Sequence, residues 1–336
     1  MKKGLIVLVL IVSAALLFAA GAKEQTGATK QVQKVTIQIE GSAVPYYAPI
    51  FNAIEKGYFK EEGLDVQYMF GNAADITKNV AVGNVEFGFP NGEPVILARS
   101  QGIPVVVVHT TLQHGLGATI FLKSSGITKP ADLKGKSVGI TSFGSPNYVQ
   151  LQVLLEMNGL SINDVKVEII GTEAIVPALV NKRVDAICFS MLRTYELKSQ
   201  NIDVDEFRSD EFLPSFGNVL VVGKSYLEKN KPAVQAFVRA LNKSLTELAD
   251  QAKVKSAVSL VIEKHTPTFK GREDYMANII SSVYAGYLWK SEDTEKFGYG
   301  YGNVERWQKT ADILLRYGII KQAVNAKDFV VPEILK

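Results

Sequence analysis

Short β-branched runs alternate with longer helix-like segments along the chain, beginning near residue 34. Apolar runs bounded by turn residues predict strands, and the segments between them predict helices. The run PVVVV is apolar at every position, which is typical of a strand covered on both faces. This first series predicts strands at 35–39, 64–70, 85–89 and 104–110, with helices at 48–59, 73–82 and 94–100.

A second series of the same kind follows, and its order again predicts a mostly parallel sheet sandwiched by helices. A strand at 216–224 then leads the chain out of this second series. The next segment, 233–249, has apolar residues at helical spacing. Further helices are expected at 253–264, 273–289 and 303–317. The second series itself predicts strands at 118–123, 136–141, 166–170 and 184–189, with helices at 148–157 and 174–180.

The N-terminus has the three parts of a secretory signal. Met1-Lys2-Lys3 is basic, residues 4–20 carry no charge, and Ala20-Gly21-Ala22 is a small-residue cleavage pattern. The alternative is an uncleaved anchor helix, because the apolar run approaches the length that spans a bilayer. Residues 1–22 are predicted to be a signal peptide and 23–33 a disordered leader, so the mature protein is expected to be periplasmic or extracytoplasmic.

Composition narrows the class of protein. The 336 residues include 37 Lys and Arg against 34 Asp and Glu, which is nearly balanced and gives no basic patch for nucleic acid. The length favours two domains. Cys188 is the single cysteine, so no internal disulfide forms, and its apolar surroundings favour a buried small hydrophobe over a catalytic thiol. The three histidines lack metal-ligand spacing, so neither a metal site nor a cofactor is predicted.

Five segments, met in order along the chain, resemble the periplasmic substrate-binding proteins of ABC transporters in the nitrate, sulfonate, taurine, thiamine-precursor and riboflavin group. One departs from the group's pattern, because Asn181 or Lys182 stands where a glycine is usual. The segments are GYFKEEGLDVQYMF (57–70), GEPVILARSQGIPVVVV (92–108), SSGITKPADLKGKSVGI (124–140), PALVNKRVDAI (177–187) and WQKTADILLRYGIIKQAV (307–324).

This resemblance implies an α/β fold of two doubly wound domains joined by a two-crossing hinge, the type II periplasmic-binding-protein fold. Residues 34–117 and 218–336 would form the first domain and 118–217 the second, with the ligand in the cleft between them. Open parallel sheets independently favour ligands at the carboxyl ends of their strands. The implied partners are a small-molecule ligand and a membrane permease with its ATPase, and a monomer is expected.

The runs ARSQGIP and FGSPNY point to the relatives that bind riboflavin or the thiamine pyrimidine. One departure weakens the aminopyrimidine interpretation. Several such binders have a glutamate shortly after the Val-Asp-Ala segment, whereas this chain has Arg193 or Thr194 there and its next acid is Glu196. Sulfonate, taurine or nitrate therefore stays an alternative ligand class.

Candidate ligand contacts come from the loops at strand ends. Two adjacent tyrosines can stack on a ring or pack in a surface turn. The segments at 91–93 and 142–148 open helices, whose free N–H groups attract anions or carbonyl oxygens, although plain helix capping explains them equally. A buried phenylalanine and a solvated arginine are the alternatives after the strand at 184–189. The candidates are Tyr46, Tyr47, Asn91, Glu93, Gln113, Ser145, Asn147, Tyr148, Phe189 and Arg193.

An enzyme is the main alternative function. Proteins that resemble this fold and synthesise the thiamine pyrimidine carry a cysteine-rich, iron-binding cluster of residues, which a chain with Cys188 alone cannot build. No nucleophile elbow is visible, and GYGYG (298–302) does not follow a predicted strand as a dinucleotide loop would. We therefore expect no catalytic residues. A ligand sensor that docks on a membrane receptor is a further alternative.

Overall fold

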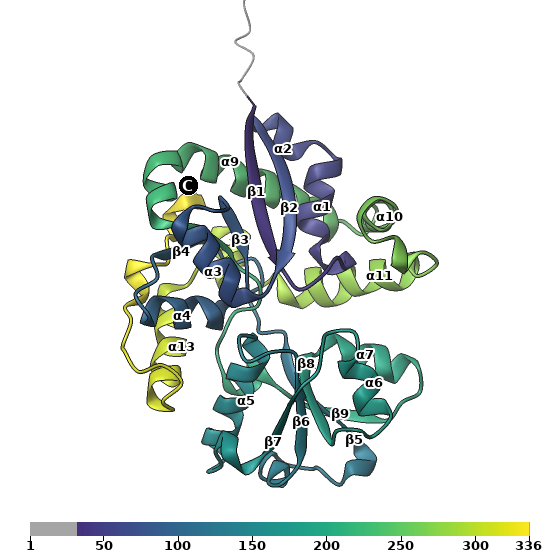
Figure 1. Cartoon of the computed structure of the whole chain (residues 1–336). Helices are drawn as coiled ribbons and strands as arrows, with labels where there is room; N and C mark the ends of the chain where they lie inside the picture. Colours follow the sequence, from purple (N-terminus) through teal and green to yellow (C-terminus); the bar gives the residue numbers. More distant parts are fainter. Residues whose placement is uncertain (1–31, 336) are drawn as a thin grey trace, which may run out of the picture. The chain divides into compact units, whose positions relative to one another are not determined.

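The first of two five-stranded sheets is mostly parallel. In the computed structural model, which describes residues 32–335, β1 pairs in parallel with β2 and β3, while β10 runs antiparallel between β3 and β4 (Figure 1). The late strand β10 therefore returns the chain to the sheet it left. In spatial order the strands are β2 (Leu64–Gly71), β1 (Gln33–Glu40), β3 (Phe87–Phe89), β10 (Leu220–Gly223) and β4 (Val105–His109).

The second sheet is built from one continuous stretch of chain. Its β6 pairs in parallel with β7 and β8, while β5 is antiparallel to β8 and β9. The chain thus crosses between the sheets twice, after β4 and before β10. The strands in spatial order are β7 (Lys166–Ile169), β6 (Ser137–Ile140), β8 (Ala186–Ser190), β5 (Gly117–Leu122) and β9 (Val204–Arg208).

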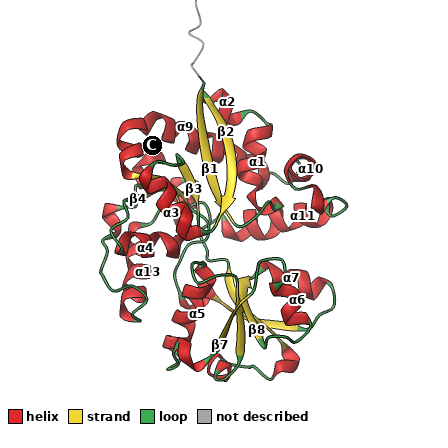
Figure 2. Cartoon of the chain, viewed as in Figure 1, coloured by secondary structure: helices red, strands yellow, loops and turns green. Residues whose placement is uncertain are grey.

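Helices cover both faces of the first sheet (Figure 2). Along β4, Val106 and Val108 join one buried cluster while Val105 and Val107 join another, which confirms a strand covered on both faces. Around this sheet the helices are α1 (Ala48–Glu55), α2 (Tyr58–Glu61), α3 (Ala73–Val82), α4 (Gly92–Ser100), α9 (Lys224–Ala249), α10 (Val254–His265), α11 (Glu273–Ile279), the π-helix η6 (Ile280–Leu288), α12 (Glu292–Phe297) and α13 (Val304–Arg316).

A third buried cluster fills the space around the second sheet, where Leu151 and Leu155 of its longest helix pack with Val138 and Ile140 of β6. The helices here are α5 (Pro146–Met157), α6 (Ile175–Val180), α7 (Leu192–Ser199) and α8 (Ser209–Phe212). Short 3₁₀ helices occur at η1 (Pro45–Tyr47), η2 (Lys123–Ser125), η3 (Pro130–Leu133), η4 (Ile162–Asp164), η5 (Pro267–Phe269), η7 (Ala326–Asp328) and η8 (Pro332–Leu335).

Several elements differ from the predicted ones. The strand β9 and the helix α7 were not predicted. The helix α9 begins nine residues before the predicted segment 233–249, because its first turns precede a kink at Asn230, two residues before Pro232. The predicted helix at 273–289 is α11 continued by a π-helix. Gln33, assigned to the leader, already belongs to β1, and its N–H donates to the Gly63 carbonyl.

Two predictions are not tested by this fold. The signal peptide and most of the leader lie outside the described residues. The division into two domains at 117 and 217 stays a prediction, because the described residues belong to one compact unit. Within the described range 32–335, the helices are all too short or too polar to cross a membrane.

Candidate ligand-binding pocket

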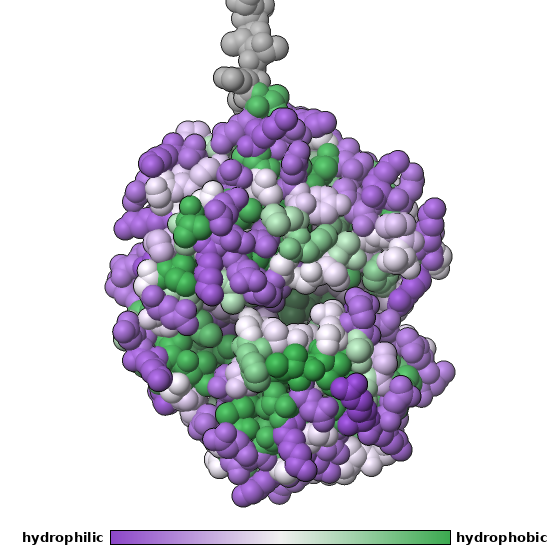
Figure 3. Space-filling model, viewed as in Figure 1, coloured by the Kyte–Doolittle hydropathy of each residue, from purple (hydrophilic) through white to green (hydrophobic). Residues whose placement is uncertain are grey.

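A pocket opens where residues from the ends of several strands meet. It contains about 910 Å³ of space, part of which is open to solvent. Figure 3 shows a hollow on this face of the molecule. One set of lining residues surrounds the first sheet: Glu40, Gly41, Ser42, Val44, Tyr46, Tyr47, Asn91, Asn218 and Tyr284. The other set surrounds the second sheet: Leu116, Gly117, Thr141, Ser145, Pro146, Asn147, Gln150, Thr172, Phe189, Ser190, Leu192 and Arg193.

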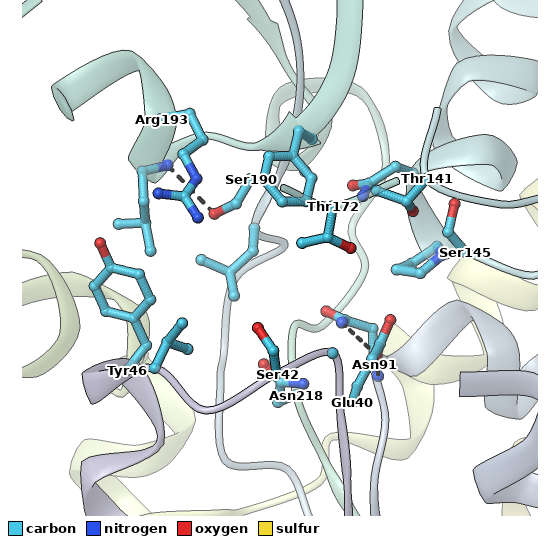
Figure 4. Close-up of a pocket in the computed structure, with 18 of the residues that line it drawn as sticks. Glu40, Ser42, Tyr46, Asn91, Thr141, Ser145, Thr172, Ser190, Arg193 and Asn218 are labelled. Carbon is cyan, nitrogen blue, oxygen red and sulfur yellow. Dashed lines mark hydrogen bonds between the residues drawn. The ribbon is translucent and has the colours of Figure 1, made fainter. Parts of the chain in front are cut away.

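Glu40, the last residue of β1, contributes a carboxyl group to the pocket (Figure 4). Its Oε2 accepts hydrogen bonds from the backbone N–H and from Nδ2 of Asn91, both at 2.9 Å. The pKa of Glu40 is raised to about 7, chiefly by burial and in smaller part by the negative charge of Glu93, while the hydrogen bonds from Asn91 act in the opposite direction. The carboxyl group therefore changes charge near neutral pH.

Aromatic rings from η1 and η6 line another part of the pocket. The ring of Tyr46 stacks on Tyr284 of η6, with centroids 5.6 Å apart and planes 14° apart. Tyr47 lies edge-on to Phe51 and Phe89, and its hydroxyl donates to the backbone carbonyl of Glu40. Because the hydroxyl of Tyr47 is already engaged, this side chain offers its ring rather than a donor.

Arg193 lies across the pocket from Glu40 (Figure 4). Its guanidinium sits 5.3 Å from the ring centre of Phe189 and makes a 2.6 Å ion pair with Glu196. Glu196 also binds Arg272, at 3.3 Å, so a single carboxylate serves two guanidinium groups. The side chain of Arg193 is therefore paired and only 23% exposed, rather than standing free in solvent.

The loop before α5 supplies polar groups from the second sheet. The Ser145 hydroxyl accepts from the Tyr148 N–H at 3.3 Å and donates to the Ser142 carbonyl at 2.8 Å, so Ser145 caps the helix as well as lining the pocket. Asn147 also lines the pocket. The side chains of Ser42, Asn147, Thr141 and Thr172 have no hydrogen-bond partner within the described part of the chain, which leaves them available to a ligand.

Three candidate residues do not line this pocket. Glu93 is fully buried and accepts a 2.7 Å hydrogen bond from Nε2 of Gln150, so it supports a residue that does line the pocket. Gln113 is also buried, and its amide NH₂ donates hydrogen bonds to the carbonyls of Thr110 and Tyr301. The ring of Tyr148 turns away and packs edge-on to Phe143, with centroids 5.1 Å apart.

Other pocket residues were not singled out from the sequence. Glu40, Thr172 and Ser190 lie at or just after the carboxyl ends of β1, β7 and β8, and Asn218 precedes β10. The signal that could have identified Glu40 is an acid at the end of a strand whose Val35, Ile37 and Ile39 are buried. Cys188 is buried as predicted, hydrogen-bonds Thr119, and does not line this pocket.

A family model described as "NMT1/THI5 like" matches residues 44–253. The riboflavin-binding protein RibY of Chloroflexus aurantiacus is 26% identical over 301 residues, which cover 88% of this chain and 84% of that protein. The formylaminopyrimidine-binding protein of Halalkalibacterium halodurans is 28% identical over 324 residues, 94% of each chain. A 4-amino-5-hydroxymethyl-2-methylpyrimidine phosphate synthase of Aspergillus parasiticus is 30% identical over 226 residues, 63% of this chain and 65% of that one.

Solved structures match the fold at low identity. The alkanesulfonate-binding protein SsuA of Xanthomonas axonopodis has a TM-score of 0.66 and 16% identity, covering 89% of this chain and 98% of that one. The periplasmic nitrate-binding protein NrtA of Synechocystis has a TM-score of 0.68 and 13% identity, covering 90% and 87%. These matches confirm the α/β, type II periplasmic-binding-protein fold expected from the sequence.

Proposed function

The chain belongs to the NMT1/THI5-like family, and from this premise we propose that it is the substrate-binding component of an ABC importer. Its ligand is a small heteroaromatic vitamin or vitamin precursor, of the riboflavin or thiamine-pyrimidine type. The names of two relatives, a riboflavin-binding and a formylaminopyrimidine-binding protein, support this ligand class. The protein works outside the cytoplasm, as a monomer, and delivers its ligand to a membrane permease coupled to an ATPase.

Two features of the pocket support the proposed ligand class: its aromatic rings, and the pairing of Arg193 with Glu196. Tyr46, stacked on Tyr284, and Phe189 offer flat apolar surfaces to a planar ring. A sulfonate or nitrate would depend on an unpaired cation, yet Arg193 is already paired with Glu196. Glu40 adds a carboxyl group that repels an anion whenever it is ionised. The alternative ligand class is therefore disfavoured by charge.

The proposal includes no catalytic reaction. Several relatives are named as synthases, so an enzyme is the alternative function. Against it stands the state of Cys188, the single cysteine of the chain. Burial raises the pKa of its thiol to about 12, so this group is neither a ready nucleophile nor a soft metal ligand at neutral pH. A ligand sensor would use the same pocket, and dependence of vitamin uptake on the protein separates the two roles.

Calorimetry with riboflavin, 4-amino-5-hydroxymethyl-2-methylpyrimidine, taurine and nitrate tests the ligand class directly. We expect one of the two ring compounds to bind and both taurine and nitrate to fail. Tyr46→Ala should weaken binding several-fold, since an aromatic contact contributes about 0.5–1.5 kcal/mol beyond the area it buries. Tyr195→Ala is the matched control, because Tyr195 is 41% exposed and does not line the pocket. Tight binding of taurine or nitrate, with neither ring compound bound, would refute the proposed ligand class.

A further inference from the structure

The two oxygens of the Glu40 carboxyl group have different surroundings. Oε2 accepts two hydrogen bonds from Asn91, through its backbone N–H and its Nδ2. Oε1 has no hydrogen-bond partner within the described residues. The backbone of Glu40 is held between β2 and η1, because Glu40 pairs with Gly71 and its carbonyl accepts from the Tyr47 hydroxyl. Glu40 lines the pocket and is only partly buried, so Oε1 is the oxygen left for a ligand.

We propose that Oε1 of Glu40 accepts a hydrogen bond from an N–H on the edge of the ligand ring, so that the pocket selects heteroaromatic molecules with an imide or amine at that edge. This inference rests on the proposed function and adds the feature by which ligands are distinguished. The hydroxyl groups of Ser42, Thr141 and Thr172 can each donate or accept, so they tolerate either kind of ligand edge. An ionised carboxylate accepts only, and it therefore discriminates.

Protonation reverses the role of Oε1. Because Oε2 already receives two N–H donors, a proton on Glu40 resides on Oε1, which then donates instead of accepting. Glu93 on α4 and Tyr47 on η1 are the titratable groups that face Glu40, and neither supplies a positive charge. Arg193 belongs to the opposite wall and pairs with Glu196. The pKa of Glu40, raised to about 7 chiefly by burial, places this reversal near neutral pH.

Binding should therefore depend on pH in a defined direction. A ligand N–H favours the ionised form of Glu40, so binding releases a proton and weakens as the pH falls. With a pKa of about 7, the dissociation constant should rise about tenfold from pH 8 to pH 6. A ligand that offered a carbonyl oxygen to Oε1 would show the opposite trend, because it needs the protonated form.

Glu40→Gln tests the geometry without removing bulk. The two donors of Asn91 would hold the glutamine oxygen, which turns the amide NH₂ toward the pocket. A donor would then face the ligand N–H, and we expect at least a tenfold rise in the dissociation constant together with loss of the pH dependence. Glu86→Gln is the matched control, because Glu86 accepts from the Thr36 N–H at 2.7 Å and does not line the pocket. Chemical denaturation of both variants verifies that they fold.

Riboflavin and its N3-methyl derivative complete the experiment, because methylation removes the imide N–H and leaves the ring system intact. Fluorescence quenching should show weaker binding of the methylated flavin to the wild type and a much smaller difference with Glu40→Gln. If a ring compound binds equally well to the wild type and to Glu40→Gln from pH 6 to pH 8, the role of Glu40 is wrong while the proposed function stands. If neither riboflavin nor the pyrimidine binds the wild type, both proposals fall.

Discussion

The carboxyl group of Glu40 should reduce the stability of the ligand-free protein. Its pKa is raised from the ordinary value of 4.5 to about 7, chiefly by burial, so the folded protein holds a proton that the unfolded chain has already released. Between these two pH values the folded state binds more protons, and the free energy of unfolding therefore falls as the pH rises. This loss is complete above the folded pKa and absent below the unfolded one.

The size of the effect follows from the same pKa. At about 1.4 kcal/mol for each pH unit, the full loss would be about 3 kcal/mol. Glu40 is partly exposed to the pocket, so we expect about 1–3 kcal/mol. Glu40→Gln keeps an oxygen for Asn91 but has no charge to bury. The variant should therefore gain about 1–3 kcal/mol relative to the wild type between pH 5 and pH 8.

Urea denaturation of both proteins, without ligand, measures this gain as the difference between their free energies of unfolding at each pH. Taking the difference cancels the titration of groups that do not interact with Glu40, such as buried His109. A difference that is the same at pH 5 and pH 8 would show that Glu40 is not buried as a charge. A wild type that gains stability over the variant as the pH rises would contradict the sign of the argument.

Two further predictions concern contacts outside the ligand pocket. Arg272, just before α11, forms an ion pair with Glu196 on α7, so this pair joins a helix beside the first sheet to one beside the second. Partly exposed ion pairs contribute about 1 kcal/mol or less, so Arg272→Ala should make the ligand dissociate a few-fold faster in stopped-flow measurements. An unchanged rate would mean that this pair does not retain the ligand. Gly300→Ala should lower the melting temperature by several degrees, because the new Cβ would lie 1.9 Å from the His109 ring at a φ of +82°; a melting curve matching the wild type would contradict that packing.

The elements that were predicted well have strong local signals. The helix α3 was predicted with its observed bounds, because Asn72 caps its start and Gly83 follows its end in the left-handed conformation. The strand β9 was missed because it is an edge strand with one buried residue, Val204, ahead of polar Asp205 and Glu206. Such a strand has little apolar pattern, and its pairing with β5 comes from tertiary structure.

Sequence reasoning identified the loops of the pocket better than the side chains within them. The segments near 46, 91 and 145 each follow a predicted strand, so they were expected to lie close together, and all three line the pocket. The direction of each side chain depends on the helix that follows. Asn91 precedes α4 and lines the pocket, whereas Glu93, two residues later, turns inward to meet Gln150. Only the three-dimensional packing of α4 against α5 decides between them.

The acid of this pocket comes from a different wall than the resemblance suggested. In several similar binders a glutamate follows the Val-Asp-Ala segment, where this chain has Arg193 and Thr194. Thr194 turns away to donate a 2.5 Å hydrogen bond to Glu206, and the next acid, Glu196, pairs with Arg193 rather than standing free. The ligand-facing carboxyl is supplied instead by Glu40 at the end of β1. A ring that presents an N–H to one wall and a carbonyl to Arg193 on the other would satisfy both groups. An imide or a substituted pyrimidine offers this arrangement, whereas nitrate and sulfonates without an amine have no N–H to present.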